Sequence, residues 1–415
     1  MSTSGFAVLF LALEISLFSA AASFLGGKLG YPKLISSARI AVFGVCGLLS
    51  LSVALLLYAL FSHDFHLSYV ADHSSRDMSP LYLLTSFYAG NEGSLLFWAW
   101  LLSIFAVVAN VQNRARNREL MPFASSVIMA IEAFFLVLLV FVANPFVELS
   151  VLPADGHGLN PLLENVGMVL HPPVLLAGYV GFAIPFAFAI AALITRRVGG
   201  EWLTTVRRWV LISWLLLGLG NLIGAWWAYT ELGWGGYWGW DPVENAGLMP
   251  WLMATAVLHA SVLQRKRGMF KAWNMVLIIL TFNLTIFGTF LTRSDFLASV
   301  HTFGLSDMDP YFLTLLGVAL IGPLILLLYR RDELKGEVME GALISRENAF
   351  LVGNLILVFA TLVVLLGTLL AWKQSMFNYW AGSTLFALIV LMGLCALIGW
   401  RRETLKNLGP RLLPA

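Results

Sequence analysis

Charged residues are scarce in this chain of 415 residues. Asp, Glu, Lys and Arg make up 12% of it, and the net charge is only +2. A soluble domain is about one quarter charged, so this composition excludes a soluble enzyme, a disordered chain and a nucleic-acid-binding protein. Because the chain is 59% hydrophobic and its apolar runs are long rather than short and alternating, it is predicted to be an all-α polytopic membrane protein and not a membrane barrel.

Cysteine is also scarce. Cys46 and Cys395 both lie in apolar runs, and the sequence has no CxxC pair and no Cys/His spacing of the kind that binds zinc. We predict that both cysteines are small residues of the core. Any thiol chemistry would therefore come from a partner.

Long apolar runs dominate what is present. A membrane-spanning helix needs about 20 apolar residues, and we predict eleven spans in a single transmembrane domain over residues 1–415. The first run carries Glu14 and lacks a basic start, so it is not predicted to be a cleavable signal. The predicted spans are 5–25, 40–61, 95–112, 122–144, 174–195, 209–229, 246–263, 273–292, 311–329, 349–371 and 380–399.

The basic residues alternate with these spans. Of the 25 Lys and Arg residues, 22 fall in the segments that follow odd-numbered spans, and only Arg76, Arg293 and Lys373 fall on the other side. Cytoplasmic loops of membrane proteins carry an excess of Lys and Arg. We therefore predict that the N-terminus is outside and the C-terminus is cytoplasmic.

One predicted outer segment is rich in tryptophan. Residues 226–251 contain six of the 15 tryptophans. An interfacial aromatic belt would explain Trp226 and Trp227 at a helix end, but not the alternation of Trp and Gly over 233–240. Glycine lets the backbone approach a ligand closely, and indole rings offer flat apolar faces. The pattern therefore predicts an outer-face platform for a large planar molecule.

The end of this segment has the signature of a helix start. Asp241 is suited to cap the following helix and Pro242 to occupy its first turn, with Glu244 and Asn245 also near its amino end. Capping is favoured over direct contact with a ligand. No side chain is assigned as a catalytic acid.

Histidines flank the platform in the sequence. His171 precedes the fifth predicted span and His301 follows the eighth. Two imidazoles on either side of a flat macrocycle can supply both axial ligands of a haem iron, and the prolines that follow His171 are expected to fix where it leaves the membrane. For the three histidines of the first outer loop, solvation is favoured over metal binding; they are His63, His66 and His73.

The segment WGGYWGWDPVEN (234–245) resembles the tryptophan-rich WWD motif of a haem-handling superfamily that includes CcmF, CcmC and CcsA. Three further stretches resemble the CcmF family, at 162–190, 289–303 and 345–369. The likeness extends from about residue 5 to about residue 400, although Tyr237 stands where the family usually has Trp.

The resemblance implies a cytochrome c haem lyase component of the bacterial cytoplasmic membrane, active only with partners. It would receive haem from the chaperone CcmE and, with CcmH and CcmI, join it to the CxxCH motif of apocytochrome c. By position, His171 and His301 match the axial ligands of this haem. The matching platform comprises Trp227, Trp234, Gly235, Gly236, Tyr237, Trp238, Trp240, Asp241, Pro242, Glu244 and Asn245.

His259 is the one histidine inside a predicted span. It matches one of two membrane histidines that hold a permanent haem b in the family, although a helix–helix hydrogen bond would also explain it. The family's second such histidine lies beyond the position of Ala415, and no histidine follows His301 here. A second CcmF fragment completes the site, or the chain is truncated or divergent, or haem b is absent.

Two other functions fit parts of the pattern. A haem exporter or carrier of the CcmC type would load a chaperone without ligating apocytochrome c, but the length of the chain and its CcmF-like stretches argue against it. A secondary transporter or a respiratory proton-path subunit would use ionisable residues within spans, such as Glu14 and Glu132. An absorption spectrum separates this class, because a transporter should be colourless.

Overall fold

The structure, a computed structural model, describes residues 2–115, 117–231, 236–299, 301–303, 307–336 and 346–397. Within these ranges the regular structure is helical, apart from an isolated bridge between Leu67 and Glu148. The long helices are α1 (Ser2–Leu29), α2 (Pro32–Phe61), α5 (Asn91–Gln112), α6 (Met121–Phe141), α7 (Val166–Gly181), α8 (Ala183–Thr195), α9 (Glu201–Glu231), α10 (Pro242–Arg267), α11 (Lys271–Leu291), α12 (Asp309–Tyr329), α13 (Arg346–Leu369) and α14 (Gln374–Leu397). The short ones are α3 (Ser68–His73), α4 (Pro80–Ser86) and the 3-10 turn η1 (Pro161–Leu163).

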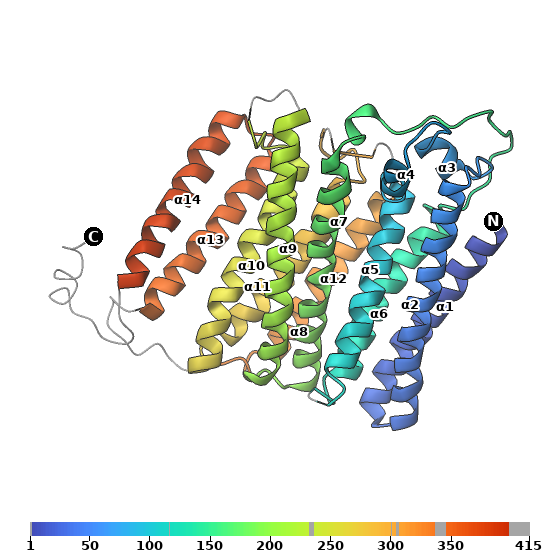
Figure 1. Cartoon of the computed structure of the whole chain (residues 1–415). Coiled ribbons are helices and arrows are strands. Elements are labelled where there is room, and N and C mark those ends of the chain that lie inside the picture. The colour runs from blue at the N-terminus through green and yellow to red at the C-terminus, as the bar shows by residue number, and fades with distance from the viewer. Residues whose placement is uncertain are drawn as a thin grey trace.

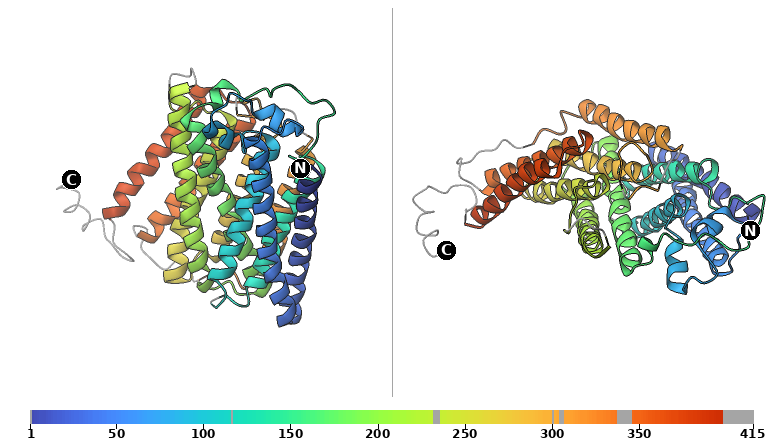
Figure 2. Two further views of the ribbon diagram at one scale, coloured as in Figure 1. Left: turned by 45° about the vertical axis from the view of Figure 1, so that its right-hand side comes forward. Right: turned by 90° about the horizontal axis from the view of Figure 1, so that it is seen from above.

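The eleven predicted spans are confirmed among the described residues. Eleven segments are long and apolar enough to cross a membrane, with α7 and α8 together forming the fifth. The long helices run side by side, with α1 and α2 at one edge of the bundle and α13 and α14 at the other (Figures 1 and 2). The most deeply buried spans are α6, α7–α8, α10 and α11, whereas α12 and α14 are the least buried.

The loops divide between the two ends of the bundle. The short connections after α1, α5, α8 and α10 lie at the lower end in Figure 1, and most of the basic residues lie in these connections or in the helix ends that they join. The opposite end carries α3, α4 and the long connection between α6 and α7 (Figure 1). We call it the α3/α4 end.

Helix α7 begins eight residues earlier than predicted, and it continues through the two prolines that precede the predicted start. Pro172 and Pro173 have no N–H, so the carbonyls of Met168 and Val169 lose their helical donors. The Tyr88 hydroxyl lies 3.3 and 3.4 Å from these two oxygens and supplies one donor that they share. Burial raises the pKa of Tyr88 to about 12, which keeps this hydroxyl protonated.

This difference changes the position of His171. The sequence placed it in the loop before the fifth span, whereas it lies one and a half turns inside α7.

A second, smaller difference concerns the cysteines. Cys46 is half-buried on α2 and not part of the core, and the side chain of Cys395 lies outside the described residues.

Candidate functional site

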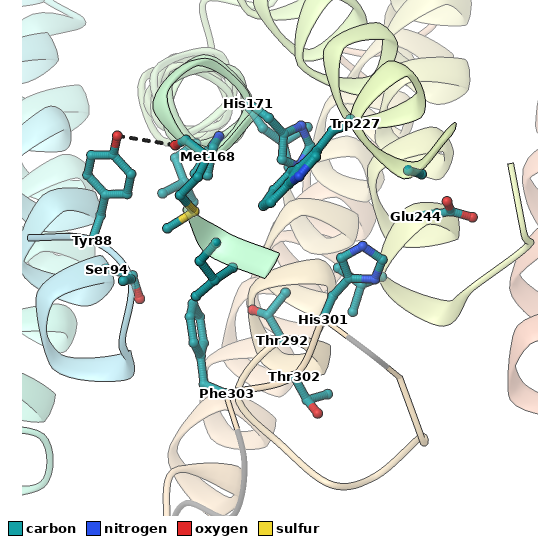
Figure 3. A pocket seen from close by; sticks show the side chains of 18 of the residues that line it. Tyr88, Ser94, Met168, His171, Trp227, Glu244, Thr292, His301, Thr302 and Phe303 are labelled. Atoms are coloured by element: carbon teal, nitrogen blue, oxygen red, sulfur yellow. Dashed lines mark hydrogen bonds between the residues drawn. The ribbon is translucent and has the colours of Figure 1, made fainter. Parts of the chain in front are cut away.

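A cavity of about 310 Å³ opens at the α3/α4 end of the bundle (Figure 3). Its walls come from the amino ends of α5, α7 and α10, the carboxyl ends of α9 and α11, and the segment that follows α11. Segments far apart in the sequence thus enclose one space. Of the residues predicted to form the site, five line this cavity: His171, Trp227, Trp238, Glu244 and His301.

Glycines on α7 and α9 bring the two helices close enough to form one wall. A Cβ atom on Gly178 would lie 2.6 Å from the backbone nitrogen of Leu217, and one on Gly220 would lie 2.8 Å from Cα of Leu175. Small residues allow helix backbones to approach in this way in membrane proteins. The close approach places the imidazole of His171 against the backbone of α9.

The imidazole of His171 is held in one tautomer. Its Nδ1 atom lies 2.8 Å from the carbonyl oxygen of Gly220, and because a carbonyl can only accept, Nδ1 carries the proton. The lone pair is then on Nε2. Metal-binding histidines are characteristically oriented by this kind of hydrogen bond from the other ring nitrogen.

Substitution of Gly224 on α9 tests the packing of His171 against this helix. A Cβ at this position would lie 2.5 Å from Cε1 of His171, so Gly224→Ala should displace the imidazole and weaken ligand binding at the cavity by about tenfold or more. The matched control is Gly322→Ala on α12, where a Cβ meets nothing within 4 Å. Titration of both variants with haem is the measurement, and equal affinities would contradict the proposed packing.

Asp241 joins the tryptophan-rich segment to the segment that carries His301. Its Oδ1 accepts hydrogen bonds from the backbone N–H of Val243 at 2.9 Å and from the hydroxyl of Ser299 at 2.7 Å, and lies 3.0 Å from Nδ1 of His301. Burial raises the pKa of Asp241, but the hydrogen bonds from His301, Ser299 and Val243 outweigh it and hold the pKa below its usual value. The carboxylate therefore stays ionised.

The ionised carboxylate fixes the second imidazole as the Gly220 carbonyl fixes the first. With Nδ1 of His301 donating to Asp241, Nε2 becomes the lone-pair nitrogen.

The predicted capping role of Asp241 is also confirmed. Asp241 is the N-cap of α10, and Glu244 completes a capping box by accepting from the N–H of Asp241 at 3.2 Å and of Gly239 at 2.9 Å.

The predicted platform divides into two parts. Trp227 and Trp238 line the cavity. Gly167 lies directly beneath Trp227, because a Cβ at this glycine would overlap the indole ring. The ring centroids of Trp227 and His171 are 5.9 Å apart (Figure 3). These two indoles form the aromatic wall of the cavity.

The other part of the platform faces away from the cavity. Trp240 has a φ of +58° and stacks on Phe377 of α14 with ring centroids 4.9 Å apart, and its Nε1 donates to Asn378. Tyr237 stacks on Tyr229 at 4.4 Å. Trp234 and Gly235 lie outside the described residues. The remaining members, which are described but do not line the cavity, are Gly236, Asp241, Pro242 and Asn245.

His259 lies apart from this cavity. It is 17 residues after the start of α10, which at the helical rise places it about 25 Å along the axis. It is half-buried, and its ring centroid is 5.5 Å from that of Phe350 on α13. The three histidines of the first outer loop also lie outside the cavity lining.

Sequence reasoning missed the wall of the cavity opposite the indoles. It is formed in part by Tyr88, Ser94, Met168, Arg293 and Phe303. The only signal was the position of Arg293 within the stretch TFLTRSDF, as a lone basic residue next to an apolar run. The sequence does not show that this arginine is buried.

The donor set fits a haem iron. Among the described residues, no group of three or more His, Cys, Asp and Glu side chains is placed to hold a metal ion. A pair of imidazoles in one cavity suits an iron whose other four ligands come from a porphyrin. The indole faces beside His171 suit the ring of such a ligand.

Comparison with known proteins agrees with this chemistry. Residues 88–297 match the family of cytochrome c assembly proteins. Similar proteins include the cytochrome c-type biogenesis protein CcmF of Haemophilus influenzae, 37% identical over 95% of this chain and 63% of the relative, and the biogenesis protein ccl1 of Rhodobacter capsulatus, 37% identical over 99% and 65%. A solved structure of cytochrome c heme lyase CcmF matches with a TM-score of 0.83 and 34% identity, over 99% of this chain and 64% of the other. The chain thus spans just under two thirds of the length of these relatives.

Proposed function

This chain belongs to the cytochrome c assembly protein family, and from that premise we propose that it binds haem between His171 and His301 and presents it for attachment to apocytochrome c. The observation that carries the proposal is the pair of imidazoles lining one cavity, each oriented by a hydrogen bond at Nδ1. The chain would be the membrane component of a haem lyase.

The eleven spans and the bacterial relatives make this chain a multi-pass protein of the bacterial cytoplasmic membrane. We infer that the α3/α4 end, with the cavity, faces the periplasm. The basic loops gather at the opposite end of the bundle, and such loops stay in the cytoplasm. The N-terminus would then be periplasmic.

The two imidazoles have different roles in this proposal. His171 is fixed on α7 against the glycines of α9, whereas His301 lies on a segment between helices and its side chain is 30% exposed. Of the two residues that would hold haem, His301 would therefore be the one that is more easily displaced by the histidine of the CxxCH motif. When bound, haem supplies the two vinyl groups to which the cysteine thiols add.

The rest of the site contributes position. The indoles of Trp227 and Trp238 hold a flat ring and exclude water from one side of the cavity. Asp241 holds His301 at the amino end of α10 through the hydrogen bonds described above. Rate enhancement in this proposal comes from proximity and orientation, with the reactive groups on haem and substrate.

The partners and the second haem follow from the family. We propose that the chain acts only with CcmE as haem donor and with CcmH and CcmI. His259 on α10 would be one ligand of a haem b in the membrane.

The proposal is tested by purifying the chain with and without these partners. A pyridine haemochrome assay counts bound haem, and covalent attachment to a CxxCH-containing reporter measures lyase activity. We expect bound haem with the chain alone and attachment only with the partners. A colourless chain would favour a transporter, and haem bound without any attachment in the full set would favour a carrier.

A further inference from the structure

A buried arginine lines the same cavity as the two histidines. Arg293 follows the end of α11, and only 2% of it is exposed. Its Nη1 donates to the carbonyl of Thr289 at 3.2 Å and to the hydroxyl of Thr292 at 2.9 Å. Its Nη2 donates to the hydroxyl of Ser94 in the first turn of α5 at 2.6 Å. The guanidinium is therefore held rigidly between two helices.

Burial of this charge is costly. Removal from water lowers the pKa of Arg293 to about 9, while the nearby charge of Glu92 raises it. The three hydrogen-bond partners given above are neutral oxygens, so these bonds hold the guanidinium in place without cancelling its charge. A cation held in the wall of a cavity can bind an anionic ligand.

We propose that Arg293 binds a propionate carboxylate of the haem in this cavity. The inference rests on the proposed function, because it assigns a second contact to the same ligand. Arginine pairs with carboxylates through two parallel hydrogen bonds, which fix orientation as well as adding affinity. Among the described residues that line the cavity, Arg293 is the only Lys or Arg, whereas the acidic side chains there, Glu231 and Glu244, would repel a propionate.

The position of this contact orients the ligand. Ser94 and Tyr88 lie on one side of the cavity, Glu244 lies on the other, and Trp227 and the two imidazoles lie between them (Figure 3). With the propionates toward Arg293, which hydrogen-bonds to Ser94, the vinyl edge of the ring would face the side of Glu244. The thiols of the substrate would then approach from that side.

Haem and its dimethyl ester test the contact, because the ester lacks the carboxylate charges and keeps the iron and the ring. Wild-type chain should bind haem about 10- to 100-fold more tightly than the ester, the range expected for a hydrogen bond between charged groups. Arg293→Gln should remove this preference while binding the ester as well as wild type does. Arg76→Gln, at an exposed arginine outside the cavity, is the matched control and should keep the preference.

The outcomes separate this inference from the proposed function. If wild type binds neither ligand, the proposed function fails. If wild type binds both ligands equally, or if Arg293→Gln weakens both equally, the propionate contact is wrong and the haem site stands. Should Arg293→Gln not fold, Arg293→Lys replaces it. Its shorter side chain, which cannot form the paired bond, should reduce the preference at least about threefold, and an unchanged preference would overturn the inference.

Discussion

Replacing His171 or His301 with glycine should convert bound haem from low spin to high spin and weaken its binding by more than about 100-fold. The loss exceeds that of an orienting residue, because a direct bond to iron is removed. Each imidazole is oriented by a hydrogen bond at Nδ1 that leaves Nε2 as the nitrogen for the iron. Absorption and electron paramagnetic resonance spectra of the reconstituted variants are the measurement.

Two controls make this result specific to ligation. His157→Gly removes an exposed histidine that pairs with Asp72 outside the cavity, and it should leave the spectrum unchanged. Added imidazole should restore the low-spin spectrum of each glycine variant, because the vacated space accepts the free base. Variants that retain the wild-type spectrum without imidazole would exclude the two residues as ligands.

Replacing Asp241 with asparagine should lower haem affinity by about 10- to 100-fold, as is typical when the residue that orients a ligating histidine is changed. Asparagine keeps an oxygen that can cap α10 but loses the charge that holds the Nδ1 proton of His301. Thermal unfolding should therefore change little. Isothermal or spectroscopic titration with haem measures the affinity.

Asp241→Ala separates the two roles of this residue. It removes the cap as well, so stability should fall by about 1 kcal/mol in addition to the loss of affinity. Ser299→Ala removes one of the three donors to Asp241 but keeps the carboxylate, and it should have the smallest effect on haem. If Asp241→Asn binds haem as tightly as wild type, the carboxylate does not orient His301.

The number and order of the spans could be predicted because they depend on local composition. Apolar runs of about 20 residues and the alternation of basic loops can both be identified in the sequence without knowledge of tertiary contacts. The start of α7 could not be predicted, because it depends on a distant donor. The Tyr88 hydroxyl compensates for Pro172 and Pro173 from another part of the chain.

The candidate site could be predicted in part. The composition of the tryptophan-rich segment pointed to a flat ligand, but not to which indoles face it. Trp240 turns away because its positive φ and its stacking on Phe377 direct it toward α14. Arg293 was counted as a loop charge, because burial by Ser94 and Phe303 is a property of the assembled helices. The local sequence pattern shows which types of side chain are present, whereas the direction in which each side chain points depends on tertiary packing.

The most direct test of the account is a cryo-electron microscopy map of the chain reconstituted with haem. We predict one porphyrin at the α3/α4 end, with Nε2 of His171 and Nε2 of His301 bonded to the same iron from opposite faces of the ring. A porphyrin located elsewhere, or an iron in this cavity with neither imidazole bonded to it, would contradict the account.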